Sequence, residues 1–161
     1  MSVDQNFIIG EFKRVLDERF RLSIPSELAD QLTAESPRCT LTKERVGCLG
    51  LWNAEIWQAK LRADVELVKG KLAAGKLGDQ VGRLQLLGRL LSTRDTEVSL
   101  AGRGRLLVPE GFREFLGVEP GGEVMVVGAG VSIEIWNPAA WIKYVEQRMP
   151  KFRTLLNRLS S

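Results

Sequence analysis

The phrase Arg-Leu-x-aliphatic-Pro occurs twice in this chain, as RLSIP at 21–25 and as RLLVP at 105–109. The offset between the two phrases, 84 residues from position 21 to position 105, also aligns distant residues without a gap. The aligned pairs include Leu16 and Leu100, Arg19 and Arg103, Trp52 and Trp136, Asn53 and Asn137, and Trp57 and Trp141. All four tryptophans of the chain fall in these pairs, which indicates a tandem duplication.

We place the two copies at 7–80 and 81–161, and the linker that joins them at 70–91, where DQVGRLQLLGRLL forms a second amphipathic stretch. The period exceeds the ~20–50 residues of solenoid units, so each copy is expected to be a half-domain and not a stacking repeat. The chain of 161 residues is long enough for two small units that share one core. Each half is therefore expected to complete the core of the other.

The composition restricts the classes of function. No apolar run approaches the ~20 residues of a membrane span, and the N-terminus lacks the pattern of a signal peptide, so we expect a cytoplasmic protein without a membrane partner. Two cysteines and no histidine leave neither a disulfide framework nor the usual metal ligands, so no metal and no cofactor is expected. The net charge of +3, from 23 basic and 20 acidic residues, permits a nucleic-acid partner without requiring one.

Within each copy the pattern predicts a strand, a tight turn, a strand, a short helix, two more strands and a helix of about twenty residues. Gly102 and Gly104 supply the backbone freedom of the turn in the second copy. Asn53 and Asn137 stand where a helix N-cap is expected, and Pro138 suits the first helical position. The expected fold class is β-rich α+β.

The sequence contains no complete catalytic motif. The stretch GKLAAGKL at 70–77 is close to a phosphate-binding loop, but Leu77 has no hydroxyl for Mg²⁺ and the stretch follows a helix pattern. The chain has no G-x-S-x-G elbow and no histidine to serve as a base. We therefore expect no enzyme and no small-molecule substrate.

The tryptophans allow two interpretations. They could stack on single-stranded nucleic acid, as aromatic side chains do in many such proteins. In each copy, however, one tryptophan closes a strand and the other lies in the first turn of the following helix. We favour a structural role, in which each pair holds a helix against its sheet.

Basic residues gather at the turn that precedes each phrase. On a hairpin, residues two apart point to one face, so the paired arginines of each turn are expected to project together. A solvated turn is one explanation, and contact with phosphates or guanine edges is the other, since arginine geometry suits both groups. The candidate DNA-binding residues that this clustering indicates are Lys13, Arg14, Arg19, Arg21, Arg103 and Arg105.

The stretch VLDERFRLSIPSEL resembles the opening of the MraZ family, and AGRGRLLVPEGFREFLGV, EVMVVG and IEIWNPAAW agree with its second half. The resemblance implies a transcriptional regulator of two tandem AbrB-like swapped-hairpin half-domains, forming a double-split β-barrel-like core with a helix after each. It also implies a nucleoid-associated, ring-like homo-oligomer that binds double-stranded DNA at promoter direct repeats of the division and cell-wall gene cluster. Asp17, Arg19 and Arg21 fall at the family's DNA-contact motif, with Asp17 orienting Arg21.

Two positions depart from the family pattern. Phe20 replaces the usual glycine of the first turn, and an aromatic residue with positive φ would be strained, so we expect this hairpin to turn differently. Ala101 replaces an acidic residue, so Arg105 is expected to lack a partner and the second copy to bind DNA more weakly or to serve in assembly. These changes keep open a protein-interaction module that has lost DNA affinity, and RNA binding is a weaker third alternative.

Overall fold

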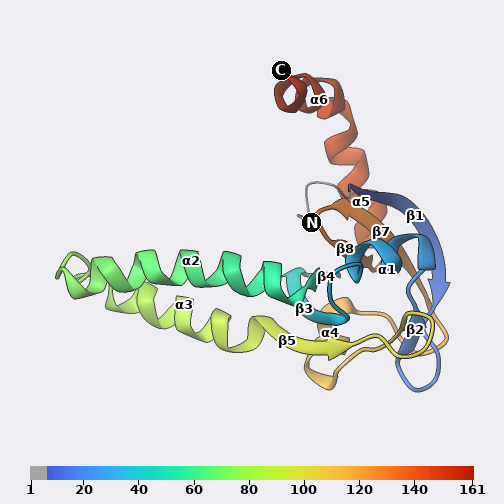
Figure 1. The fold of residues 1–161 in the computed structure, drawn as a ribbon, viewed down its shortest axis with the longest axis horizontal. Helices are drawn as coiled ribbons and strands as arrows, with labels where there is room; N and C mark the ends of the chain where they lie inside the picture. Colours follow the sequence, from blue (N-terminus) through green and yellow to red (C-terminus); the bar gives the residue numbers. More distant parts are fainter. Residues whose placement is uncertain (1–6) are drawn as a thin grey trace.

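The computed structural model describes residues 7–161 and has the expected β-rich α+β architecture (Figure 1). Its strands form a six-stranded antiparallel sheet and a separate two-stranded ribbon. The strands are β1 (Ile8–Val15), β2 (Arg21–Ser23), β3 (Arg38–Arg45), β4 (Cys48–Asn53), β5 (Asp95–Ser99), β6 (Arg105–Leu107), β7 (Glu123–Gly130) and β8 (Ile133–Trp136). The helices are α1 (Ser26–Leu32), α2 (Ala54–Ala73), α3 (Val81–Arg94), α4 (Glu110–Leu116), α5 (Pro138–Arg148) and α6 (Phe152–Ser160), with a 3-10 turn, η2 (Met149–Lys151), before α6.

The large sheet carries the duplication in its strand order, β1-β7-β8-β4-β3-β5. Under the 84-residue offset β1 corresponds to β5, β7 to β3 and β8 to β4, so the order reads the same from both ends. β1 of the first copy pairs with β7 of the second, and β5 of the second pairs with β3 of the first. Each copy thus receives the first strand of the other. The described strands close no barrel, so the barrel-like part of the prediction is not seen.

The two copies of the repeated phrase pair with each other. β2 and β6 run antiparallel with Leu22 opposite Leu106, and these are equivalent positions of the duplication. A pseudo-twofold axis therefore passes between the two leucines. Both are buried, so the ribbon closes over the core with this pair at its centre.

The core is built from both copies in nearly equal parts. Aliphatic side chains of the sheet, the ribbon and the short helices α1 and α4 form one buried cluster, which includes Leu22, Leu28, Leu41, Leu106, Leu116 and Ile135. Burial of apolar surface is the main favourable term in folding, and here it requires both halves at once. This agrees with the expectation that the halves share a core.

The tryptophans are structural, as predicted. Trp52 and Trp57 have ring centroids 5.4 Å apart, and the equivalent Trp136 and Trp141 lie 5.2 Å apart. The exposed fractions of the first three are 8%, 4% and 2% respectively, while Trp141 is half-buried. Each pair joins the last strand of its copy to the helix that follows.

The indole N–H groups add a second link between the copies. Trp57 donates to the carboxylate of Asp95 on β5, and Trp141 donates to the carboxylate of Glu11 on β1. Glu11 and Asp95 are equivalent positions, each on the first strand of the other copy. The helix after one copy is thus bonded to the strand that the partner copy contributes.

The predicted helix caps are confirmed. The side-chain oxygen of Asn53 accepts backbone N–H bonds from the first turn of α2, and that of Asn137 does the same for α5. Pro138 is the first residue of α5, where its missing N–H costs nothing. Both helices therefore begin at the predicted residues.

The lengths of the helical segments differ from the prediction. α2 has the expected 20 residues, but α5 has 11 and gives way to the 3-10 turn that contains Pro150. The stretch at 70–91 is not a simple linker, because most of α3 lies within it and runs antiparallel beside α2 as a projecting helical hairpin (Figure 1). Among the described residues, no helix has the length and apolar character needed to cross a membrane.

Candidate nucleic-acid interface

The outer face of the β2–β6 ribbon collects side chains from both phrases. Because successive side chains of a strand point to opposite sides, the central leucines face the core while Arg21, Ser23, Arg105 and Leu107 face outward. Arg21 lies opposite Leu107, and Ser23 lies opposite Arg105. The ribbon therefore presents two arginines on one diagonal, next to a hydroxyl and an apolar side chain.

The first turn is organised by the carboxylate of Asp17. Its Oδ1 accepts the backbone N–H of Arg19 at 2.8 Å and that of Arg21 at 2.9 Å. Its Oδ2 accepts the Nε–H of the Arg21 guanidinium at 3.1 Å. One carboxylate thus closes the turn and holds the side chain of Arg21, which is the orienting contact that the family motif implied.

These hydrogen bonds also set the charge of Asp17. The backbone N–H of Arg21 lowers the pKa of the Asp17 carboxyl below its ordinary value, with smaller contributions from the backbone N–H of Arg19 and the Arg21 guanidinium. Hydrogen bonds to a carboxylate favour its ionised form. Asp17 is therefore an anion at neutral pH, able to orient a cation beside it.

The second turn closes without a carboxylate. The N–H of Ala101 donates to the carbonyl of Arg105 at 2.9 Å, and the N–H of Arg105 donates back to the carbonyl of Ala101 at 2.8 Å. Within residues 7–161 the Arg105 guanidinium makes no hydrogen bond and no ion pair. The guanidinium of Arg21 is thus held by the Asp17 carboxylate, whereas no side chain of the described residues holds that of Arg105.

The backbone of Phe20 corrects one expectation. Its φ is 59°, in the left-handed region, and the equivalent Gly104 has a φ of 86°. A residue with a Cβ pays roughly 1–2 kcal/mol for this conformation. The guanidinium of Arg113 lies over the Phe20 ring at 4.0 Å, a contact that offsets part of this cost. The first turn therefore keeps the left-handed residue, and it differs from the second in the acceptor supplied by Asp17.

Lys13 and Arg14 do not join the turn. Both lie on β1, where neighbouring side chains point to opposite faces. Lys13 lines a groove beside α5, while the guanidinium of Arg14 lies over the ring of Phe12 at 5.6 Å. Lys13 and Arg14 thus belong to the strand that precedes the turn, and their part in DNA binding stays a prediction.

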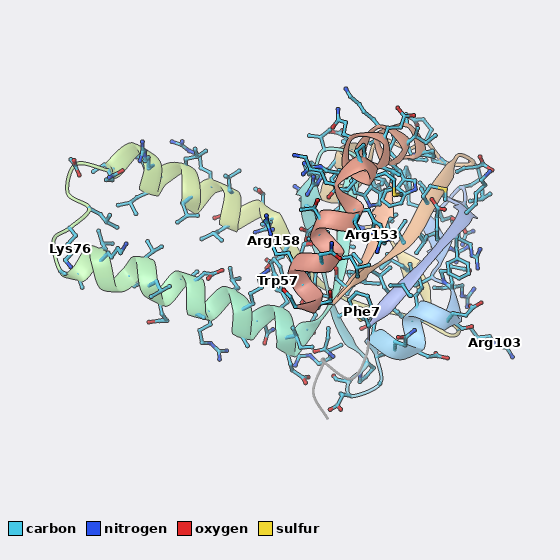
Figure 2. The ribbon with its side chains drawn as sticks, turned by 90° about the horizontal axis from the view of Figure 1, so that it is seen from above. Phe7, Trp57, Lys76, Arg103, Arg153 and Arg158 are labelled. Carbon is cyan, nitrogen blue, oxygen red and sulfur yellow. The ribbon has the colours of Figure 1, made fainter. Side chains whose placement is uncertain are left out.

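Arg19 and Arg103 occupy equivalent exposed positions in the two turns. Neither side chain makes a hydrogen bond or an ion pair within the described part of the chain. Because β2 and β6 are antiparallel, the two turns lie at opposite ends of the ribbon. Figure 2 shows Arg103 at the end of the molecule opposite Lys76, which marks the tip of the α2–α3 hairpin.

The sequence analysis missed Ser23 and Leu107 as members of this face. The signal for them was the alternation within each phrase, which places the first and third residues on one side of a short strand. That alternation could be read from the sequence. The pairing of the two phrases, which brings the residues together, could not.

The fold and this face define a class of protein, a duplicated β-rich molecule whose halves exchange strands and expose a basic two-stranded ribbon.

A family model described as "MraZ protein, putative antitoxin-like" matches residues 91–159. The protein named "Transcriptional regulator MraZ" from Thioalkalivibrio sulfidiphilus is 32% identical over 130 residues, which cover 80% of this chain and 78% of the relative. The protein of the same name from Clostridium acetobutylicum is 30% identical over 138 residues, covering 86% and 87%. A third, from Alkaliphilus metalliredigens, is 28% identical over 151 residues, covering 94% and 95%. The chain belongs to the MraZ family, a family of transcriptional regulators and not of enzymes.

Proposed function

We propose that this chain is a sequence-specific DNA-binding transcriptional regulator of the division and cell-wall gene cluster. In this proposal it binds promoter direct repeats as a ring-like homo-oligomer of subunits with two AbrB-like halves, at 7–80 and 81–161. Family membership supports the general role. The observation that carries the proposal is the outer face of the ribbon, where Arg21 and Arg105 lie together between turns that bear Arg19 and Arg103.

The geometry suits a duplex. The major groove of B-DNA admits a two-stranded β-ribbon, and arginine can form two hydrogen bonds with the edge of a guanine. Arg19 and Arg103 in the turns reach outward from the ribbon's ends, where phosphate contacts fix the register of a protein on DNA. Asp17 holds the guanidinium of Arg21 beside the turn, so this arginine loses less freedom when it binds.

Assembly would add to this affinity. In a ring each subunit repeats the same ribbon, and neighbouring ribbons bind neighbouring repeats of one DNA molecule at high effective concentration. A weak contact per ribbon is then sufficient for tight binding overall. Repeated operator sequences are the natural target of such an arrangement.

Titration of labelled direct-repeat DNA at several salt concentrations tests the proposal, with a scrambled duplex as the reference. Replacement of Arg19 and Arg21 by alanine should weaken binding and reduce the slope of log K against log[salt] by about 0.9 for each lost phosphate contact. The matched control replaces Arg62 and Arg83, exposed on the projecting helical hairpin, and should leave the slope unchanged. An unchanged slope in the folded Arg19/Arg21 variant would exclude the ribbon as the DNA contact.

A protein-interaction module remains the second candidate, favoured by one feature. The groove between α2 and α3 is lined by aliphatic side chains, among them Leu61, Val65 and Leu87. Exposed apolar surface of this kind often marks an interaction site. Equal affinity for direct-repeat and scrambled DNA, at the level of non-specific binding, would favour this candidate over the regulator.

A further inference from the structure

The C-terminal helix α6 carries an apolar stripe that nothing in the described chain covers. Phe152, Leu155, Leu156 and Leu159 recur at the spacing of one helix face, and every residue of α6 is exposed. α6 lies at the far end of α5, outside the body of the sheet (Figure 1). An isolated helix shorter than ~12–15 residues is marginal in water, so this helix needs a surface to pack on.

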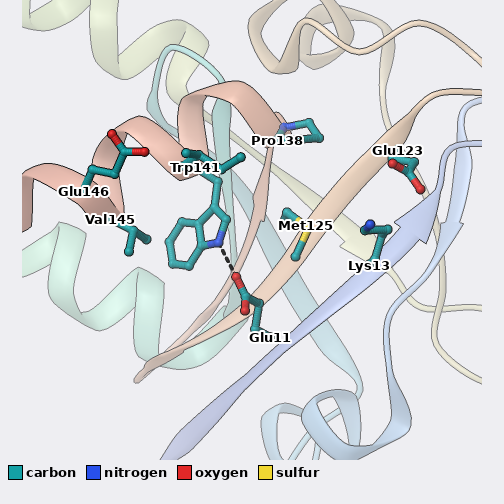
Figure 3. Close-up of a pocket in the computed structure, with 9 residues that line it drawn as sticks. Glu11, Lys13, Glu123, Met125, Pro138, Trp141, Val145 and Glu146 are labelled. Carbon is teal, nitrogen blue, oxygen red and sulfur yellow. Dashed lines mark hydrogen bonds between the residues drawn. The ribbon is translucent and has the colours of Figure 1, made fainter. Parts of the chain in front are cut away.

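A groove on the same chain offers such a surface. It is a cavity of about 490 Å³ between α5 and the outer side of β1 and β7. Its floor is apolar, with Met125, Trp141, Ile142 and Val145, and Ile142 is 58% exposed. Figure 3 shows Trp141 in the middle of the groove, with its indole N–H donating to Glu11.

The duplication indicates what this groove holds. The equivalent side of α2 faces α3, because Leu61 of α2 shares a groove with Leu87 and Leu91 of α3. Arg94, the last residue of α3, lies over the ring of Trp57 at 5.1 Å. Val145 is the equivalent of Leu61 under the 84-residue offset, yet within residues 7–161 the groove that it lines is bordered by residues of α5, β1 and β7 and by no second helix. In the first copy, the amphipathic helix α3, which ends with the basic residue Arg94, packs beside α2. In the second copy, the equivalent groove beside α5 holds no such helix of the described chain.

The charges of α6 and of the groove beside α5 are opposite. Residues 149–161 contain Lys151, Arg153 and Arg158 and no aspartate or glutamate. The groove beside α5 is lined by three carboxylates, those of Glu11, Glu123 and Glu146, against the single ammonium of Lys13.

The other apolar groove fits this helix less well. The groove between α2 and α3 carries one carboxylate, on Asp64, and two cations, on Lys69 and Arg94. Two copies of α6 would bring like charges together. The basic α6 therefore complements the groove beside α5 better than either of these surfaces.

We propose that α6 of one subunit docks in the groove between α5, β1 and β7 of the next subunit, with its apolar stripe on Trp141 and its cations at the carboxylate rim. The contact joins two different surfaces, so it is head-to-tail and extends until a ring closes. This inference rests on the homo-oligomer of the proposed function and assigns the surfaces that build it.

Disulfide trapping in the full-length protein tests the contact. The variant Ile142→Cys/Leu156→Cys should, on oxidation, give a ladder of covalent oligomers longer than dimers, and each single variant should remain one 18.0 kDa chain. The native thiols give little background because Cys39 and Cys48 are buried. Burial also raises the pKa of the Cys39 thiol to about 11.

Other outcomes would overturn the proposal. Covalent dimers from Leu156→Cys alone would mean that α6 pairs with α6. A ladder from Val68→Cys/Leu156→Cys, and not from Ile142→Cys/Leu156→Cys, would place α6 in the α2–α3 groove. A wild-type protein that is monomeric by light scattering, or an oligomer in which no pair is trapped, would also refute it.

Charge reversal provides an independent readout. Arg153→Glu/Arg158→Glu and Glu123→Arg/Glu146→Arg should each lower the mass in light scattering toward one chain, and mixing the two proteins should restore assembly. The matched control, Lys71→Glu/Lys76→Glu, changes the same charge at the hairpin tip and should keep the wild-type mass. Failure of the mixture to assemble would refute the charge pairing. Salt-slope measurements on the reduced proteins separate this result from the DNA proposal, since they test the ribbon independently of the helix.

Discussion

Ala101→Asp should give the second turn the orienting carboxylate that the first turn has. Ala101 is the equivalent of Asp17 under the 84-residue offset, and both turns close with a backbone N–H bond from this position to the carbonyl of the arginine four residues later, at 2.9 Å in each. The new carboxylate would stand where it can accept the backbone N–H and the Nε–H of Arg105. We expect the substitution to strengthen DNA binding.

The magnitude follows from the freedom that Arg105 loses on binding. Immobilising one long side chain at an interface costs about 0.5–1.5 kcal/mol, and a partner that orients the side chain beforehand removes that cost. At about 1.4 kcal/mol per tenfold change, the gain is about 2- to 12-fold in affinity for each ribbon. The added negative charge near phosphates opposes the gain, so the lower end of this range is expected at low salt.

Fluorescence anisotropy with one direct-repeat duplex at fixed salt measures the effect. Ala101→Asn is the matched control, because its amide oxygen can accept the backbone N–H but forms no ion pair with the guanidinium of Arg105. The expected order of affinity is aspartate, then asparagine, then the native alanine. A weaker affinity for Ala101→Asp than for the native protein, with Ala101→Asn unchanged, would show that repulsion outweighs orientation and that the reasoning from Asp17 is wrong.

Three further predictions concern the same turns. Arg21→Ala should harm DNA binding more than Arg105→Ala, because only Arg21 is oriented in advance, while both variants keep the wild-type mass; equal losses in a titration at one salt concentration would contradict this. Gly104→Ala should lower the free energy of unfolding by about 2–4 kcal/mol, from left-handed strain and overpacking, because a Cβ there would meet a backbone carbonyl oxygen at 2.8 Å. Gly102→Ala should cost only about 1–2 kcal/mol, from left-handed strain alone, and equal urea midpoints for the two variants would refute the comparison. Because the pKa of Asp17 is lowered from 3.8, its ionised form stabilises the fold above that pH, and the stability difference between the wild type and Asp17→Asn should shrink as the pH falls from about 5 to 3.

The local features of the fold were open to prediction from the sequence because they depend on neighbouring residues. Asn53 and Asn137 cap helices through hydrogen bonds to residues two and three positions later, so the contact depends on local sequence alone. The duplicated tryptophan pattern marks the strand before each helix. Pro150 was an unused signal for the end of α5, since a proline disfavours the helical conformation of the residue before it. The second helix would have been predicted shorter had that signal been used.

The long-range pairings could not be predicted in the same way. The alternation of apolar and polar residues in a strand predicts which of its faces is buried, but it does not predict which strand it pairs with. The pairing of β1 with β7 therefore could not be inferred from the sequence of either strand. For the same reason the sequence grouped Lys13 and Arg14 with Arg19 and Arg21, although the first two lie on β1 and not in the turn. The residue types of the candidate site were thus predictable, whereas the strand pairing that brings Ser23 and Leu107 beside the arginines was not.

Because β1 pairs with a strand of the second copy, it stays unpaired during most of translation. β1 is complete when Val15 leaves the ribosome, but its partner β7 is not complete until Gly130. At roughly 5–20 residues per second, the 115 residues from position 15 to position 130 take about 6–23 s. Throughout that interval the nascent chain carries a strand edge that its own unfinished half cannot yet cover. A second nascent chain on the same message offers the same β7 sequence sooner, so the earliest competitor of correct folding is the neighbouring copy of this protein.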